Sequence, residues 1–184
     1  MSEALPFPLG QGSTTITSKR GRQVHVRHIR ATDDTLLIDL FHRLSDESRR
    51  LRFHSPVPNY PDTFLRDMAH RMADLDPHQA DALIATVQEE GHERAIGVAR
   101  LAVDPDDQAI VEGAIVIRDD YQGEGIGSVL FDLIVQVAIV RGHRFMRALS
   151  LVENRAVHRL IERLGLPYSS QTSRGEVTTM IRLA

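Results

Sequence analysis

Three glycines stand within five positions directly before a long apolar segment: Gly123, Gly125 and Gly127 precede residues 128–141. Glycine is unfavourable inside a helix. Three glycines at the start of a helix therefore indicate that the function of this turn depends on an exposed backbone. A strand that runs into such a turn and then into a helix leaves several backbone N–H groups pointing in one direction. Because the helix dipole adds positive potential at the same place, the turn suits a phosphate or a pyrophosphate.

Two familiar phosphate-binding motifs do not match this turn. The dinucleotide-binding pattern G-x-G-x-x-G would need a third glycine where Ser128 stands. A P-loop would need Gly-Lys-Ser/Thr, and no lysine follows these glycines. What remains is Gln-x-x-Gly-x-Gly at Gln122, Gly125 and Gly127. Taken alone, glycines at a strand–helix turn can also serve the backbone conformation and nothing else.

The turn is one of several motifs through which the chain resembles the GCN5-related N-acetyltransferase (GNAT) family. The similarity covers most of the chain from about residue 24, and its motifs are IVIR at 115–118, DYQGEGIG at 120–127, VENRA at 152–156 and LGL at 164–166. Residues 41–53 (FHRLSDESRRLRF) also resemble the segment that introduces the acetyltransferase domain of bacterial Pat-type protein lysine acetyltransferases. Those proteins often carry an acyl-CoA-synthetase-like or cyclic-nucleotide-binding domain, which we do not expect within 184 residues.

The resemblance implies acetyl-coenzyme A (acetyl-CoA) as co-substrate and an amine as acceptor. Backbone groups of Ile115, Val116 and Ile117 would pair with the pantetheine arm as an additional strand. Asn154 would hydrogen-bond the pantetheine, cap its own helix, or do both, with the backbone in the capping role. Arg155 would contact cofactor phosphates or simply lie exposed in a first helical turn. The pyrophosphate would be bound by Gln122, Gly123, Glu124, Gly125, Ile126, Gly127 and Ser128.

Acetyl transfer to an amine needs a proton acceptor, because an amine such as that of lysine is mostly protonated at neutral pH. Glu112 is our candidate, since it interrupts the apolar run 110–117 and matches the general-base glutamate of the Pat-type enzymes that the sequence resembles. In the centre of a sheet, partial desolvation would raise the pKa of its carboxyl group. The alternative is a carboxylate on an edge strand that pairs with an arginine.

Two further positions bear on the chemistry that the resemblance implies. Some GNAT enzymes place a base on the following strand, five residues before the asparagine, but Leu149 stands there. Many members place a tyrosine seven residues after the asparagine, as acid for the leaving thiolate, and here that position is Ile161. Protonation of the thiolate must therefore come from water, a backbone N–H or another hydroxyl group.

The elements that must position these residues follow from hydrophobic periodicity. Alternating or apolar runs predict strands at 24–29, 82–87, 95–103, 109–118, 144–152 and 177–183, the middle three as an antiparallel meander. Helices are expected after Thr32, after Ser45, around 64–68, at 125–141 and after Asn154. This order predicts an α/β (α+β) fold with a mixed, mostly antiparallel sheet of six to seven strands flanked by helices, which is the GNAT fold. We expect a flexible arm over residues 1–20 and one acetyltransferase domain over 21–184.

The composition of the chain bears on which cofactors, partners and cellular location we expect. The chain has no cysteine, which excludes disulfides and thiolate chemistry, and its net charge of −3 gives no argument for nucleic acid. Its nine histidines form no metal-binding motif, so we expect no metal. Without a secretory signal or an apolar run of membrane-spanning length, we expect a cytoplasmic monomer or homodimer with no membrane contact. The basic run Lys19-Arg20-Gly21-Arg22 is interpreted as a solvated junction.

These observations predict an acetyl-CoA-dependent N-acetyltransferase in which the acceptor amine attacks the thioester directly and Glu112 takes up its proton. The acceptor is a protein lysine or a small amine, and we expect its binding site to be built from segments 41–80 and 166–176. The alternative is an acyl-CoA-binding sensor or interaction module that keeps the fold without turnover.

Overall fold

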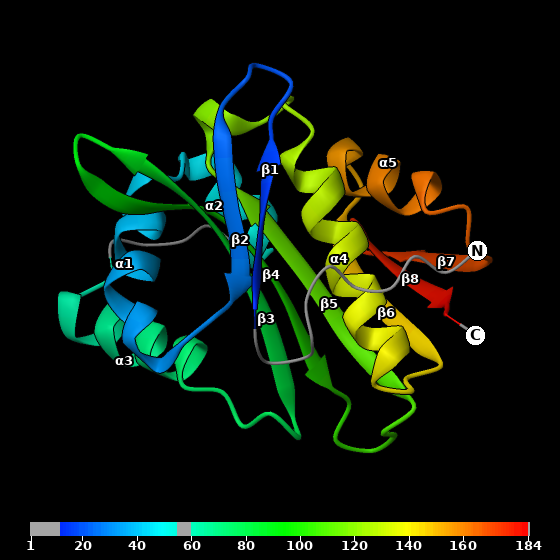
Figure 1. Ribbon diagram of the computed structural model, residues 1–184. Helices are drawn as coiled ribbons and strands as arrows, with labels where there is room; N and C mark the ends of the chain where they lie inside the picture. Colours follow the sequence, from blue (N-terminus) through cyan, green and yellow to red (C-terminus); the bar gives the residue numbers. More distant parts are fainter. Residues whose placement is uncertain (1–11, 55–59, 184) are drawn as a thin grey trace.

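The computed structural model describes residues 12–54 and 60–183, whose strands form a single mixed sheet (Figure 1). Its order is β1-β2-β3-β4-β5-β6-β8-β7, and every neighbouring pair is antiparallel except β5 and β6. The strands are β1 (Ser13–Thr17), β2 (Gln23–His28), β3 (Ala80–Glu89), β4 (His92–Val103), β5 (Ile110–Ile117), β6 (Phe145–Leu151), β7 (Tyr168–Ser173) and β8 (Glu176–Arg182). The expected mixed, mostly antiparallel sheet is confirmed.

The sheet has eight strands in the described residues rather than the six or seven that we expected. The first additional strand is β1, which pairs with β2 and so corrects the expectation of a flexible arm for residues 13–17. The second is β7, which pairs with β8 where an acceptor-binding loop was expected. Both strands are polar, and every residue of β7 is exposed. Neither therefore carries the apolar alternation from which a half-buried strand is recognised.

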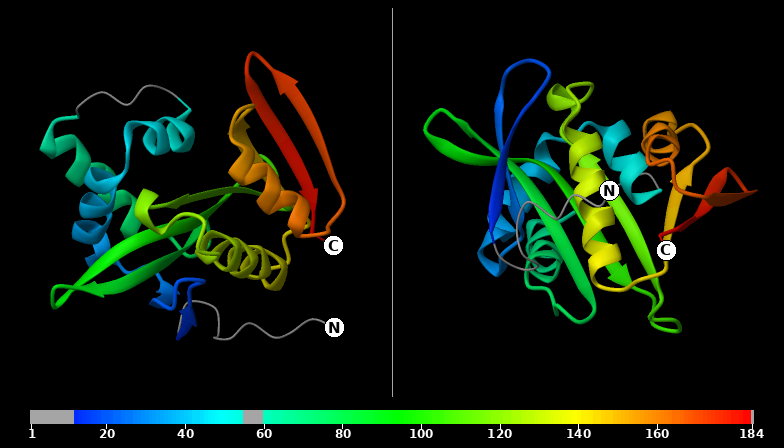
Figure 2. Two further views of the ribbon diagram at one scale, coloured as in Figure 1. Left: turned by 90° about the horizontal axis from the view of Figure 1, so that it is seen from above. Right: turned by 45° about the vertical axis from the view of Figure 1, so that its right-hand side comes forward.

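Five α-helices of the described chain cover the sheet: α1 (Asp34–Arg43), α2 (Asp46–Phe53), α3 (Asp62–Ala73), α4 (Ile126–Val140) and α5 (Arg155–Arg163). Helices α1 and α3 lie together on one face and α4 lies on the other (Figures 1 and 2). Helix α2 contacts β5 and β6, and α5 contacts α4. The N-terminal ends of α2 and α5 are capped as expected, because Ser45 and Asn154 accept backbone hydrogen bonds from Ser48 and Val157.

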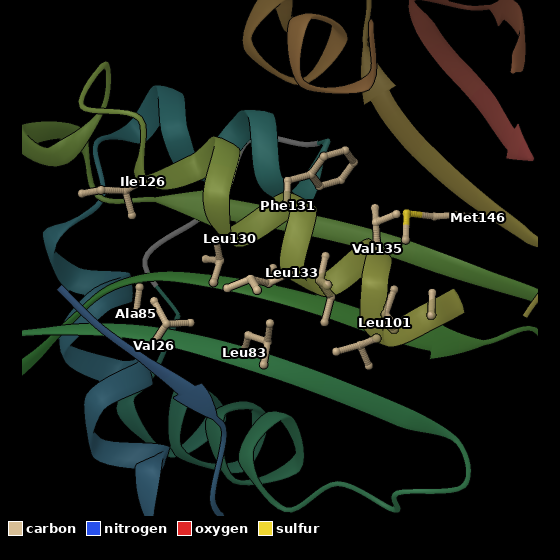
Figure 3. Packing of buried hydrophobic residues seen from close by; sticks show 14 of the residues in the cluster. Val26, Leu83, Ala85, Leu101, Ile126, Leu130, Phe131, Leu133, Val135 and Met146 are labelled. Carbon is tan, nitrogen blue, oxygen red and sulfur yellow. The ribbon is translucent and has the colours of Figure 1, made fainter. Parts of the chain in front are cut away.

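The sheet separates two apolar cores. On the α4 face, Leu130 and Leu133 lie in one buried cluster with Leu83 and Leu101 of the sheet (Figure 3). On the other face, side chains of α1 and α3 pack against Ile84 and Val98. Burial of a leucine or isoleucine side chain contributes about 1.5–3 kcal/mol, so both faces fix the sheet between its helices.

The sheet divides in the middle, and this division creates the site. Strands β5 and β6 pair only from Ile110↔Phe145 to Gly113↔Ala148. Beyond that point β5 continues in pairing with β4 alone, and β6 continues in pairing with β8. Strands β7 and β8 accordingly diverge from β3 and β4 (Figure 2). At the last pair, a Cβ atom on Gly113 would lie 2.7 Å from Met146 Sδ, so the glycine gives Met146 room to pack.

Candidate active site

A groove of about 480 Å³ lies where β5 and β6 separate, between β5, the glycine turn, α4, α5 and α2. Most of the cofactor-binding residues predicted from the sequence line it, and they come from segments far apart in the chain. Its lining residues are Lys19, Ser48, Leu51, Arg52, Ile115, Val116, Ile117, Tyr121, Gln122, Gly123, Gly125, Gly127, Ser128, Asn154, Ala156, Val157, Arg159, Leu160 and Arg163.

The glycine turn has the backbone that its sequence predicts. Gly123 and Gly125 have φ angles of 76° and 87°, in the left-handed region that favours glycine, and Gly125 precedes the first residue of α4. A Cβ atom on Gly127 would lie 3.3 Å from Ile117 Cγ1, so this glycine keeps the helix close to β5. The start of α4 therefore borders the groove with glycines that carry no Cβ atom, which allows the close approach that anion binding by backbone N–H groups requires.

The open edge of β5 faces the same groove. The Arg118 N–H donates to the Ile96 carbonyl on β4 at 2.8 Å. Because backbone groups alternate along a strand, the N–H and C=O groups of Ile117 and Ile115 point away from β4, towards the separation. Gln122 uses one of them, since its Nε2 donates to the Ile117 carbonyl at 3.0 Å. An extended ligand could pair with the rest as an added strand.

Helix α2 is attached to this edge through Asp119. The backbone N–H and hydroxyl of Ser45 donate to Asp119 at 2.9 and 2.6 Å, and the Ser48 hydroxyl donates to it at 2.8 Å. Burial raises the pKa of Asp119, but these hydrogen bonds outweigh it and hold the pKa below its ordinary value. The carboxylate therefore fixes one wall of the groove to the loop that leads into the glycine turn.

The turn between β1 and β2 brings an unexpected cation to the groove. The buried carboxylate of Glu124 accepts a hydrogen bond from the Ser18 hydroxyl at 2.6 Å, and the Lys19 N–H donates to the Glu124 carbonyl at 2.9 Å. Lys19 then lies over the glycine turn, so that a Cβ atom on Gly125 would be 3.4 Å from Lys19 Cε. Lys19 is exposed, as the interpretation of a solvated junction expects, but it also lines the groove, which that interpretation did not include. The hydrophobic periodicity of the sequence does not predict the contact between Lys19 and the glycine turn, because that contact depends on the pairing of β1 with β2.

Glu112 lies at the point where the sheet divides. It is in the second-last β5–β6 pair, opposite Arg147, and it lines a small cavity together with Leu51, Arg52, His54 and Asn154. That cavity shares Leu51, Arg52, Ile115, Asn154 and Val157 with the groove, so the two adjoin. The carboxylate is on a central strand, yet its side chain is 51% exposed. Arg147 Nη2 is 3.5 Å from it and only 2.8 Å from Asp104, which is its closer partner.

Asn154 is buried at 7% exposure and lines both the groove and the Glu112 cavity. Its side-chain oxygen accepts the Val157 N–H at 3.2 Å and so caps α5, while its backbone carbonyl accepts the His158 N–H at 3.3 Å. The amide nitrogen is the half of the side chain that remains to donate to a ligand.

The remaining predicted positions lie around the groove rather than in its lining. Arg155 is exposed and does not line it, whereas Arg159 and Arg163, one and two turns later, do. The side chains of Glu124 and Ile126 are buried in the protein, so only their backbone can face a ligand. Ile161 is 3% exposed and packs in the core on the α4 face.

Two features are absent from residues 12–54 and 60–183. No group of three or more His, Asp and Glu side chains in these ranges could hold a metal ion. Over the same ranges, no helix is both long and apolar enough to span a membrane.

Comparison with known proteins agrees with this geometry. Residues 41–166 match the model of the acetyltransferase (GNAT) family. The chain belongs to this family. It is 32% identical over 145 residues to "Acetyltransferase PA5475" of Pseudomonas aeruginosa, a match that covers 79% of this chain and 75% of that protein. The protein is therefore a GNAT acetyltransferase, and the family implies an acyl-CoA co-substrate.

Solved structures show the GNAT fold. The GNAT domain of S. lividans PAT superposes with a TM-score of 0.76 at 24% identity, over 92% of this chain and 96% of that one. Ribosomal-protein-S5-alanine acetyltransferase from Vibrio fischeri gives a TM-score of 0.67 at 14% identity, covering 93% and 95% of the two chains. A cAMP-binding acyltransferase from Mycobacterium smegmatis gives 0.60 at 22% identity, and there the match covers 94% of this chain but 47% of the other.

Proposed function

We propose that this GNAT protein transfers the acetyl group of acetyl-CoA directly to an amine, with Glu112 as the general base. The observation that carries the proposal is the end of β5–β6 pairing at Gly113↔Ala148, one residue beyond Glu112 and at the start of the groove. A thioester whose pantetheine pairs with the open edge of β5 would bring its carbonyl to this point.

The cofactor would lie along three features of the groove. Its diphosphate would be bound by the N–H groups at the start of α4, next to the Lys19 ammonium. Its pantetheine would pair with backbone groups of Ile115 and Ile117 and accept a hydrogen bond from the Asn154 amide. The same edge of β5 would supply N–H groups that polarise the thioester carbonyl.

The reaction then requires one proton acceptor and one proton donor. The amine nitrogen forms a bond to the thioester carbon, the carbon–sulfur bond breaks, and Glu112 takes the proton that the nitrogen releases. The sulfur leaves as a thiolate and is protonated. An isoleucine side chain has no proton to donate, so Ile161 plays no part in that last step.

The test replaces Glu112 by glutamine, which keeps the size of the side chain and removes its basicity. With a panel of lysine peptides and small amines, we expect Glu112→Gln to lower the rate of CoA release by about 10²–10⁴-fold while acetyl-CoA binding is unchanged. Glu162→Gln, an exposed position on α5, is the matched control and keeps the rate.

Two outcomes would contradict the proposal. An undiminished rate of Glu112→Gln across the pH range would remove Glu112 from the role of base. Acetyl-CoA binding by the wild-type protein without CoA release from any amine of the panel would favour a non-catalytic sensor.

A further inference from the structure

The register of the sheet places a cation beside Glu112 on the face covered by α1 and α3. Glu112 is opposite Ala102, and Arg100 is opposite Ala114. Residues that pair across two strands, and residues two apart along one strand, point to the same face. Glu112 and Arg100 are therefore diagonal neighbours, a relation in which the backbones are about 7–8 Å apart.

A second arginine lies between them and the cofactor groove. Arg52, near the end of α2, lines the Glu112 cavity, the groove and an apolar cavity on the α1–α3 face. Burial and repulsion by Arg100 lower its pKa, and the negative charge of Glu112 acts in the opposite direction. Burial likewise lowers the pKa of Arg100.

Within the described part of the chain, neither guanidinium forms an ion pair with a carboxylate. Arg100 Nη1 donates to the Met72 carbonyl over a long 3.4 Å, and the Arg52 guanidinium lies 5.3 Å from the Phe53 ring. Arg163, which also lines the groove, does have such a partner, since its Nη2 is 2.6 Å from Asp132. Two partly buried cations, with Glu112 acting on Arg52 from a distance but no carboxylate in ion-pair contact with either, suit a negatively charged group from a ligand.

The apolar cavity on the α1–α3 face adjoins the two arginines. It has a volume of about 50 Å³ and shares Arg52 and Ala114 with the Glu112 cavity. Since one water needs roughly 10–15 Å³ on this measure, the cavity has room for about four heavy atoms. Apart from the two arginines its lining is apolar, with Leu40, Phe41, Leu65, Met68 and Met72 among it.

We propose that the acceptor is a small apolar amino acid, whose α-carboxylate is bound by Arg52 and Arg100 while its amine faces Glu112. The inference rests on the proposed function and names the acceptor of that same site. The three groups of such a substrate match three features of the protein: the amine meets Glu112, the carboxylate meets the arginines, and the side chain enters the apolar cavity. A lysine side chain in a protein has no carboxylate close to its amine and would leave the arginines without an anion.

Binding of the reaction product tests the site independently of turnover. In protein saturated with CoA, calorimetry compares N-acetyl-L-methionine with its uncharged carboxamide. We expect the carboxylate form to bind roughly 10- to 100-fold more tightly, the range for a hydrogen bond to a charged group. Arg100→Met should remove that preference, Arg100→Lys should retain part of it, and Arg66→Met, on the exposed side of α3, should leave it unchanged. Equal binding of the two forms to the wild-type protein would overturn the inference.

Turnover separates this inference from the proposed function. Initial rates are measured with L-methionine, L-methioninamide and a lysine peptide, and we expect kcat/KM to be highest for L-methionine. If the amide or the peptide is acetylated equally well, the acceptor assignment fails while the acetyltransferase stands. If the carboxylate product binds as expected but none of the three amines is acetylated, the proposed function fails and the carboxylate site stands.

Discussion

Asn154 illustrates how one side chain serves both the fold and the site. Its oxygen caps α5 by accepting the Val157 N–H, and its amide nitrogen is left towards the groove that it lines. The two halves of the amide therefore carry different tasks, and two substitutions can separate them.

Asn154→Asp keeps an oxygen that can cap α5 but removes the donor to the ligand. We expect stability close to wild type, because aspartate and asparagine are about equally good caps, while the Kd for CoA rises by about tenfold. Asn154→Ala loses both functions, so its free energy of unfolding should fall by about 1 kcal/mol in addition. Urea unfolding and calorimetry measure the two quantities. Unaltered CoA binding by Asn154→Asp would mean that the amide has no ligand.

At this scale the sequence indicated residue types well and side-chain directions poorly. Glu112 could be identified because it interrupts an apolar run, and Gln122 and Asn154 because their motifs resemble those of the GNAT family. All three lie at the groove or its adjoining cavity. Arg155 was expected either to contact cofactor phosphates or to lie exposed, and it is exposed and does not line the groove, whereas Arg159 does. The expected desolvation of Glu112 also fails, because the sheet divides beside it and leaves its side chain half exposed.

Among the elements, the hairpin β1–β2 has the most unexpected consequence. Ser18, in its turn, donates to the buried Glu124 carboxylate, and Arg20 and Arg22 lie 3.7 and 3.6 Å from the same group. The hairpin is thus attached to the glycine turn by a side chain of that turn, and Lys19 is positioned as a result.

Lys19→Met should weaken CoA binding without changing the fold. We expect the Kd for CoA to rise by roughly 5- to 10-fold at low salt, and less at high salt, because an exposed charge is screened. Binding of pantetheine, which has no phosphate, should not change. Arg20→Met is the matched control, since Arg20 lies on the same turn and does not line the groove. Equal salt dependence in wild type and Lys19→Met would contradict the assignment.

Elements with a strong apolar period were predictable and polar ones were not. The fifteen residues of α4 bury eight apolar side chains, and the meander β3–β4–β5 shows long apolar runs, so both were clear from the sequence. Strand β1 has Ile16 as its one apolar residue and β7 has only Tyr168. Such strands are fixed by pairing with β2 and β8, which is a long-range property that local patterns do not contain.

For the whole molecule, the important feature is how two half-sheets stay in place around a central opening. Only four residue pairs join β5 to β6, so other contacts must fix the groove walls. The wall that contains the glycine turn is fixed to the β3 side of the sheet by the buried Arg118, which binds Glu89 at the end of β3 and Asp120 before the turn. Arg118 and Arg22 lie 4.7 and 4.2 Å from the Tyr121 ring, whose hydroxyl also donates to Glu89.

This cluster should make the stability of the protein depend on pH in the acid range. Hydrogen bonds from Arg118 and Tyr121 lower the pKa of Glu89 below its ordinary value of 4.5, and Arg118 lowers that of Asp120. A carboxylate with a lowered pKa in the folded state stabilises the protein above its unfolded pKa, and this contribution is lost as the pH falls through the folded value. The thermal midpoint should therefore decline below about pH 4.5. In Glu89→Gln we expect a lower midpoint at neutral pH and a shallower decline, whereas Glu162→Gln should follow the wild type. Parallel declines in wild type and Glu89→Gln, measured by calorimetry from pH 7 downwards, would show that Glu89 is not responsible for the loss of stability in acid.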